Sequence, residues 1–132
     1  TWALSRIIYM RKLLICFYVL YVLNITYFSL TPIEHKISES IWDKAAHFIA
    51  YLLLVIIIKI VHKRFCYITC VITCCSYSFI IECIQHFIPN RMFDILDMLA
   101  NVLGAILGII IYYLIIEKFF NIRIGVAAKV VN

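Results

Sequence analysis

Four long apolar stretches, separated by short polar segments, constrain this chain more than any other feature of its sequence. They cover about residues 13–30, 45–61, 66–88 and 95–116. Each is close to the roughly 20 residues that a helix needs to cross a hydrocarbon core about 30 Å thick. Hydrophobic residues make up 66% of the chain, whereas soluble domains contain about 45–50%. The sequence therefore predicts an all-α integral membrane bundle of four transmembrane helices.

The apolar body is predicted to be one domain, because no repeat, low-complexity segment or linker interrupts residues 13–116. Residues 1–12 precede it as a short N-terminal segment, and residues 117–132 follow it as a tail. Met10-Arg11-Lys12 before an apolar run resembles a natural start, so we leave open whether residues 1–9 are an upstream extension. The long apolar run after Lys12 lacks a small-residue cleavage site and is not interpreted as a signal peptide.

The basic residues predict how the bundle is oriented. With four crossings, the N-terminal segment, the loop near residues 62–65 and the C-terminal tail lie on one side, which carries nine of the 12 Lys and Arg residues. The opposite side carries Lys36, Lys44 and Arg91. Cytoplasmic loops are enriched in basic residues, so both termini are predicted to be cytoplasmic, in the bacterial inner membrane.

Charge and cysteine content exclude several other classes of function. The formal charge of +5 comes from residues that flank apolar stretches, not from a basic run interleaved with aromatics, so we expect no nucleic-acid partner. Cys66, Cys70 and Cys74 recur at helical spacing without the paired spacing of a zinc site, which favours helix packing. We expect no cofactor and no metal, although Asp43, His47, Glu82, Asp94 and Asp97 form an oxygen-rich set without diagnostic spacing.

Polar side chains cluster at the outer ends of three of the predicted helices. Asn101 is predicted to lie about 10 Å below the start of its helix, and Glu82 roughly 9 Å below the end of its own. Because lipid cannot solvate such groups, we expect the three clusters to face one another as one site. Its members are Asp43, Lys44, His47, Glu82, Gln85, Arg91, Asp94, Asp97 and Asn101.

Glu82 is the most deeply placed acid, and its environment decides between two interpretations. A carboxylate at that depth must pair, lose its charge or contact water, and its candidate partners are Lys44, His47 and Arg91. One interpretation is a buried polar network that only fixes how the helices pack. The other is a functional site, in which Glu82, Asp97 and His47 would be the acid–base groups if the protein were an enzyme.

Two glycines continue the polar face of the last predicted helix. Gly104 and Gly108 form a GxxxG pair, which allows a neighbouring helix backbone to approach closely. The pair follows Asp97 and Asn101 on the same face, so we expect this face to pack inside the bundle.

The ordered motifs of the chain resemble those of the VanZ-like family of small bacterial membrane proteins. They begin with Ser29-Leu-Thr-Pro32 and continue as D-K-x-x-H from Asp43, E-x-x-Q from Glu82, and R-x-x-D-x-x-D-x-x-x-N-x-x-G from Arg91 to Gly104. The resemblance covers about residues 13–116. It implies a small multi-pass membrane protein whose motif residues are the nine polar residues named above. The namesake of the family is associated with resistance to the glycopeptide teicoplanin; we do not carry that role over to this chain.

The leading hypothesis is a polar pocket near the outer leaflet that binds an amphiphilic or lipid-linked component of the cell envelope. Lys44 and Arg91 would contact anionic headgroup oxygens. Glu82, Asp97 and Asn101 would form the pocket floor, and His47 would supply a titratable contact. Two alternatives stay open: a membrane-embedded enzyme acting on a lipid headgroup, which we favour less, and a small assembly subunit. The oligomeric state is not predicted.

Overall fold

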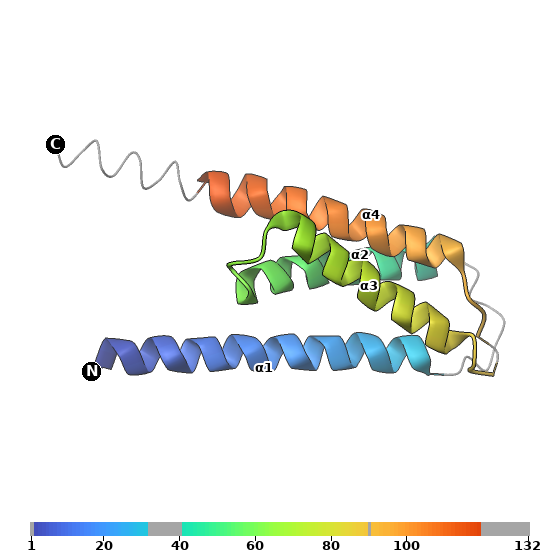
Figure 1. Cartoon of the computed structure of the whole chain (residues 1–132), viewed down its shortest axis with the longest axis horizontal. Helices are drawn as coiled ribbons and strands as arrows, with labels where there is room; N and C mark the ends of the chain where they lie inside the picture. The colour runs from blue at the N-terminus through green and yellow to red at the C-terminus, as the bar shows by residue number, and fades with distance from the viewer. Residues whose placement is uncertain (1, 32–40, 90, 120–132) are drawn as a thin grey trace.

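The computed structural model describes residues 2–31, 41–89 and 91–119, and it consists of four long helices (Figure 1). These are α1 (Trp2–Leu30), α2 (Ile41–Val61), α3 (Tyr67–Gln85) and α4 (Ile95–Ile111), and a π-helical segment, η1 (Tyr112–Lys118), continues α4. All four are long and apolar enough to cross a membrane. The prediction of an all-helical, four-span protein is therefore confirmed.

Three helix boundaries differ by three or more residues from those predicted, and one of them is the start of α2, which lies at Ile41 instead of near residue 45. The first helix begins at Trp2 instead of near residue 13, because the segment before Leu13 contains no glycine or proline to interrupt it. The third helix ends at Gln85 instead of near residue 88. The amides of Phe87 and Ile88 there bond to carbonyls three residues back, in a turn that precedes Pro89.

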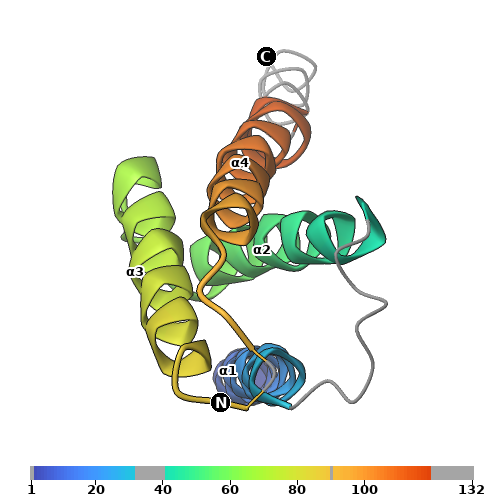
Figure 2. The ribbon, with the colours of Figure 1, turned by 90° about the vertical axis from the view of Figure 1, so that its right-hand side faces the viewer.

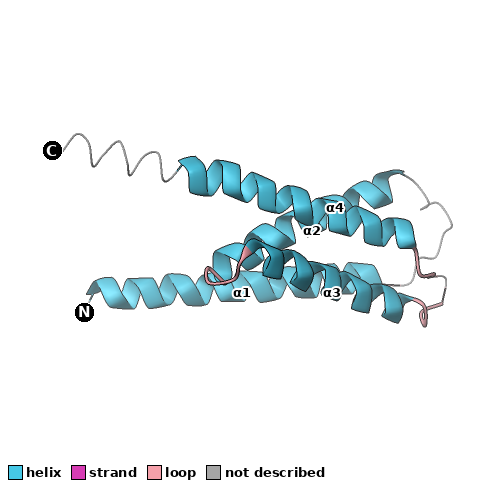
Figure 3. Ribbon diagram, turned by 45° about the horizontal axis from the view of Figure 1, so that its top comes forward, coloured by secondary structure: helices cyan, strands magenta, loops and turns pink. Residues whose placement is uncertain are grey.

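Successive helices run in opposite directions, so the chain passes back and forth along one axis (Figures 1 and 3). The end of α1, the start of α2, the end of α3 and the start of α4 lie together, on the right in Figure 1. The start of α1 and the end of η1 lie at the other end.

The contact between α2 and α4 is the most extensive in the molecule, and the two predicted packing glycines lie in it. A Cβ atom on Gly104 would overlap the backbone carbonyl of Phe48, and one on Gly108 would overlap the carbonyl of Leu52. Glycine is therefore needed at both positions for the helix backbones to approach this closely. The predicted role of Gly104 and Gly108 in helix packing agrees with this geometry.

The centre of the bundle contains small and aromatic side chains from several helices. Tyr51 and Val55 of α2 are buried together with Cys70 and Cys74 of α3 and Ala105 of α4. Cys70 and Cys74 are free thiols that pack in this core, as their helical spacing predicted, whereas Cys66, the first of the three predicted cysteines, is exposed at the start of α3.

Helix α1 lies at the side of the other three and contacts α2 and α3 (Figure 2). Most of its large apolar side chains are exposed, as expected for a surface that faces lipid. Polar contacts attach it to its neighbours: the Tyr21 hydroxyl donates to the carbonyl of Ala50 (3.0 Å), and the hydroxyls of Thr26 and Tyr77 are 2.8 Å apart. The packing contact between α1 and α2 is less extensive than that between α2 and α4.

Candidate functional site

The nine predicted site residues all belong to the first two turns of α2 or α4, the last turns of α3 or the loop between α3 and α4, and these parts lie together at one end of the bundle (Figure 1). The structure divides them into two groups. One is a charged cluster between α2, α3 and α4, and the other attaches α3 and its following loop to the end of α1.

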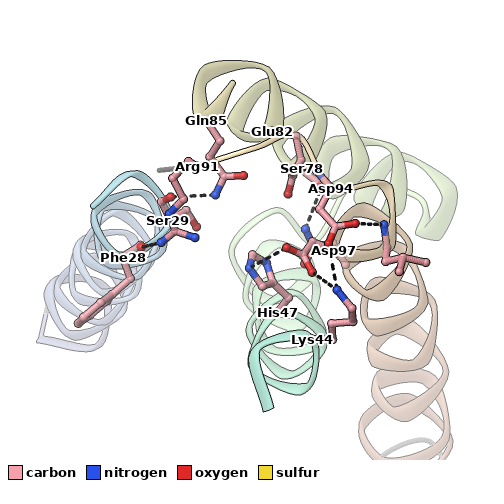
Figure 4. A network of polar contacts seen from close by, with 12 residues as sticks. Phe28, Ser29, Lys44, His47, Ser78, Glu82, Gln85, Arg91, Asp94 and Asp97 are labelled. Carbon is pink, nitrogen blue, oxygen red and sulfur yellow. Dashed lines mark hydrogen bonds and ion pairs between the residues drawn. The ribbon is translucent and has the colours of Figure 1, made fainter. Parts of the chain in front are cut away.

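Lys44 is the cation at the centre of the charged cluster. Its Nζ donates to Asp94 Oδ2 at 3.0 Å and to Asp97 Oδ1 at 3.1 Å. The side chains of Lys44 and Asp94 are about one-third exposed, whereas that of Asp97 is only 13% exposed. One lysine of α2 therefore bridges two carboxylates at the start of α4 (Figure 4). Asp94 and Asp97 are three residues apart, so their side chains point to the same side of the helix.

Asp94 also begins α4. It occupies the N-cap position with extended backbone angles, and its Oδ1 accepts a hydrogen bond from the Leu96 amide at 2.7 Å. Partial burial raises the pKa of the Asp94 carboxyl, but the Leu96 amide and the Lys44 ammonium outweigh burial and leave that pKa below its ordinary value. Asp94 is therefore an ionised cap that also pairs with Lys44.

His47 and Asp43 extend the cluster along α2. His47 Nε2 lies 3.9 Å from Asp97 Oδ2, and both side chains are about seven-eighths buried. One ligand atom each of Asp43, His47 and Asp97 lie within 4.8 Å of one another. Asp43 has no hydrogen bond or ion pair in the part of the chain that the structure describes. All three residues belong to the oxygen-rich set noted in the sequence, for which no metal was expected because the set has no diagnostic spacing.

Glu82 is almost completely buried, with 1% of its surface exposed. Its Oε2 accepts a hydrogen bond from the backbone amide of Asp94 at 3.2 Å, while Oε1 has no partner among the described residues. We expected Lys44, His47 or Arg91 to bind this carboxylate directly. That expectation is wrong, because Lys44 is occupied by two closer acids and Arg91 turns to α1; the carboxylate is nevertheless within electrostatic reach of His47 and Asp97.

Asn101 lies one level deeper in the bundle and joins α4 to α3. Its Nδ2 donates to Ser78 Oγ at 2.8 Å, and both residues are buried. Asn101 Oδ1 and the hydroxyl of Tyr51 have no partner in the described structure. The predicted seam of polar side chains therefore continues down to the level where Gly104 packs on α2.

Gln85 and Arg91 form the second group, which binds the carbonyl end of α1. Gln85 Nε2 donates to the carbonyl of Ser29 at 2.8 Å. Arg91 donates to the carbonyl of Phe28 from Nη2 at 3.1 Å, and to that of Thr31 from Nε and Nη2 at 3.3 and 3.2 Å. A cation and an amide thus satisfy carbonyls that a helix end leaves without partners. Neither residue was predicted to bind α1.

A pocket of about 290 Å³ opens between α1 and α2 beside the charged cluster. Its polar lining comes from Asn24, Ser29, Asp43, His47 and Arg91. The remainder of its lining is mainly apolar or aromatic: Tyr21, Ile25, Phe28, Ala46 and Ala50. Only three of the nine predicted residues line this pocket, so Glu82, Asp97 and Asn101 do not form its floor.

The residues of α1 in this pocket were missed by the sequence analysis. Asn24 and Ser29 were the available signal, since they are polar residues inside an otherwise apolar span. They lie five residues apart and were not recognised as part of one face.

A second polar cluster lies at the opposite end of the bundle. Lys59 is buried and donates from Nζ to the carbonyls of Lys63 (3.2 Å) and Phe65 (2.7 Å), and it lies 5.0 Å from the centre of the Tyr67 ring. The Tyr67 hydroxyl in turn donates to Glu117. Lys59 was interpreted only as a basic topology signal, and the structure shows that it also fastens the loop between α2 and α3.

Comparison with known proteins gives one match. Residues 2–116 match the family described as VanZ/LLP1, so the match covers all four helices and both groups of site residues. Neither a curated protein nor a solved structure matches the chain.

Proposed function

The chain belongs to the VanZ/LLP1 family, and on that premise we propose that its pocket between α1 and α2 binds the headgroup end of an amphiphilic or lipid-linked molecule of the cell envelope. The observation that carries this proposal is the two-sided lining of the pocket. Asp43, His47 and Arg91 supply polar contacts, and Ile25 and Phe28 supply apolar ones. A molecule with a charged head and a hydrocarbon chain satisfies both kinds of surface at once.

Arg91 is the cationic contact for an anionic headgroup. Its Nε and Nη2 are engaged by carbonyls of α1, and no hydrogen bond occupies Nη1 in the described structure. The fixed guanidinium is suited to phosphate or carboxylate oxygens. Lys44, which the sequence also suggested for this role, is compensated by Asp94 and Asp97 and contributes no net attraction.

The charged cluster supports the pocket wall. Asp97 Oδ2 lies 3.9 Å from His47 Nε2, and Lys44 binds Asp97 Oδ1, so a residue fixed on α4 backs the imidazole at the pocket surface. Glu82 and Asn101 then connect α4 to α3. The proposed role of these polar residues is to hold α2, α3 and α4 together, so that α2 forms a fixed wall of the pocket. Helix α1, which has fewer contacts, forms the opposite wall.

The bacterial inner membrane, with the pocket toward the outer leaflet, is the proposed location. The support is the excess of basic residues at the end opposite the pocket. Reporter fusions after residues 88 and 132 test it: a periplasmic reporter is expected to be active only after residue 88. The reverse pattern would place the pocket at the cytoplasmic leaflet.

Ligand binding is tested with purified full-length protein in nanodiscs, by native mass spectrometry with a polyprenyl phosphate and with phosphatidylglycerol. We expect retention of a phosphate lipid, and at least about tenfold weaker retention in Arg91→Gln. Arg11→Gln, at the other end of α1, is the charge-matched control and is expected to bind normally. Equal binding by both variants would contradict the proposal.

Catalysis on a lipid headgroup is the second candidate function. The observation in its favour is that two of the three acid–base candidates, His47 and Asp97, lie 3.9 Å apart, at the same end of the bundle as the third, Glu82 (Figure 4). Incubation of the purified protein with labelled lipid-linked precursors tests it. A product that is lost in His47→Gln would favour catalysis over binding alone.

A further inference from the structure

We propose that Asp43, His47 and Asp97 form a binding site for one divalent cation at the edge of the pocket. The starting observation is the grouping of two carboxylates and an imidazole, with one potential ligand atom of each within 4.8 Å of the other two. Two ligands of one transition-metal ion, each about 2.1 Å away, are at most about 4.2 Å apart. Three ligand atoms up to 4.8 Å apart lie up to about 2.8 Å from the centre of their triangle, so closing the group around an ion requires each to move inward by up to roughly 0.7 Å.

The distance between His47 and Asp97 supports an ion between them. Nε2 and Oδ2 are 3.9 Å apart, which is too long for a hydrogen bond. It is within the range expected for two atoms that ligate the same ion. The other oxygen of Asp97, Oδ1, accepts a hydrogen bond from Lys44 at 3.1 Å. This contact orients the carboxylate and leaves Oδ2 available to bind an ion.

The balance of charge around the cluster is the second, independent observation. Asp43, Glu82, Asp94 and Asp97 are four carboxyl groups, and Lys44, which pairs with Asp94 and Asp97, supplies a single positive charge. Glu82 is 99% buried, and its Oε1 has no partner among the described residues. An unpaired buried carboxylate is costly. A divalent cation at Asp43 and Asp97 compensates this excess negative charge.

The ligand set and its location indicate the class of ion. One imidazole with two carboxylates suits Mn²⁺, Fe²⁺ or Zn²⁺, whereas an all-oxygen set would favour Mg²⁺ or Ca²⁺. Two of the three ligands, Asp43 and His47, also line the pocket. Remaining coordination positions therefore face the pocket, where water or an anionic ligand would complete the shell.

The experiment uses full-length protein in detergent without added lipid, so that cation binding is measured separately from the ligand binding proposed above. Mn²⁺ binding is followed by electron paramagnetic resonance, with electron spin echo modulation used to detect a coordinated nitrogen. We expect one bound ion per chain and a nitrogen coupling that disappears in His47→Gln. The control His86→Gln changes an exposed histidine and is expected to retain it.

A carboxylate variant completes the test. Asp43→Asn is expected to weaken Mn²⁺ binding by at least about tenfold. Glu117→Gln, an equal change of charge at the opposite end of the bundle, is expected to leave it unchanged. The proposal is overturned if the wild-type protein binds no ion, if its bound ion shows no nitrogen coupling, or if the coupling survives in His47→Gln. Equal weakening by Asp43→Asn and Glu117→Gln would also overturn it, because it would indicate general charge attraction. If a variant fails to fold, the wild-type spectrum still tests the proposal, through the presence or absence of bound Mn²⁺ and of the nitrogen coupling.

Discussion

The Glu82 carboxylate accepts a hydrogen bond from the backbone amide of Asp94 at 3.2 Å, across the loop that joins α3 to α4. This contact connects a buried acid to the residue that caps α4 and pairs with Lys44. The buried Glu82 and the partly exposed Asp94–Lys44 pair are therefore connected by hydrogen bonds. We expect a substitution in either part to change the stability of the other.

Glu82→Ala is expected to destabilise the protein, because it leaves the Asp94 amide without its acceptor and opens a space between α3 and α4. The expected loss is about 1–3 kcal/mol in the free energy of unfolding. Glu82→Gln retains an acceptor oxygen and most of the side-chain volume, and we expect its loss to be clearly smaller. Thermal unfolding of purified protein in detergent measures both. Equal destabilisation by the two variants would show that the charge of Glu82, and not its hydrogen bond, stabilises the fold.

Lys44→Met removes the cation that compensates two carboxylates. We expect a loss of about 1–3 kcal/mol in the free energy of unfolding, because Asp97 then stays largely buried beside Asp94 and has only His47, 3.9 Å away, as a possible partner. The triple variant with Asp94→Asn and Asp97→Asn is expected to recover part of that loss. No recovery in this variant would mean that the lysine stabilises through packing and not through charge.

The contribution of Asp94 to stability is expected to depend on pH. Its pKa is lower in the folded protein than its ordinary value. A lowered folded-state pKa stabilises the fold at pH values above the ordinary pKa, near 3.9, and that stabilisation is lost as the pH falls through the folded-state value. The melting temperatures of the wild type and of Asp94→Asn should thus differ most at neutral pH and converge below pH 4. A difference that stayed constant down to pH 3 would contradict this account.

Gly104→Val is expected to separate α2 from α4. A Cβ at this position would overlap the carbonyl oxygen of Phe48, which belongs to a helix backbone and cannot rotate away. We expect a loss of several kcal/mol, or no folded protein at normal abundance. Leu103→Ala, on the exposed face of the same helix, is the control and is expected to be mild. Membrane abundance and thermal unfolding of the two variants check this prediction.

The sequence predicted the parts of this structure that depend on one helix at a time. Apolar length predicted the four spans, and the spacing of Gly104 and Gly108 predicted a packing face. Depth along each helix correctly placed Lys44, Asp97 and Glu82 at one end of the bundle.

Partners across helices could not be predicted in the same way. Glu82, Asp94 and Asp97 were all possible partners of Lys44. The rotation of each helix about its axis decides which of them Lys44 reaches, and the sequence does not specify that rotation. The sequence assigned no site residue to α1, because α1 carries no charged residue near the site. In the structure, Gln85 and Arg91 bind backbone carbonyls at the end of α1. Side-chain spacing does not predict contacts to backbone carbonyls, so it did not predict the pocket beside α1 that Arg91 lines.

A structure of the full-length protein crystallised from a lipid mesophase containing a polyprenyl phosphate tests the central claim most directly. We predict non-protein density between α1 and α2, with headgroup oxygens within hydrogen-bonding distance of Arg91 Nη1 and His47, and a hydrocarbon chain along Ile25 and Phe28. A well-ordered structure in which α1 packs against α2 with no space between them, or in which the lipid lies only on other faces, would contradict it.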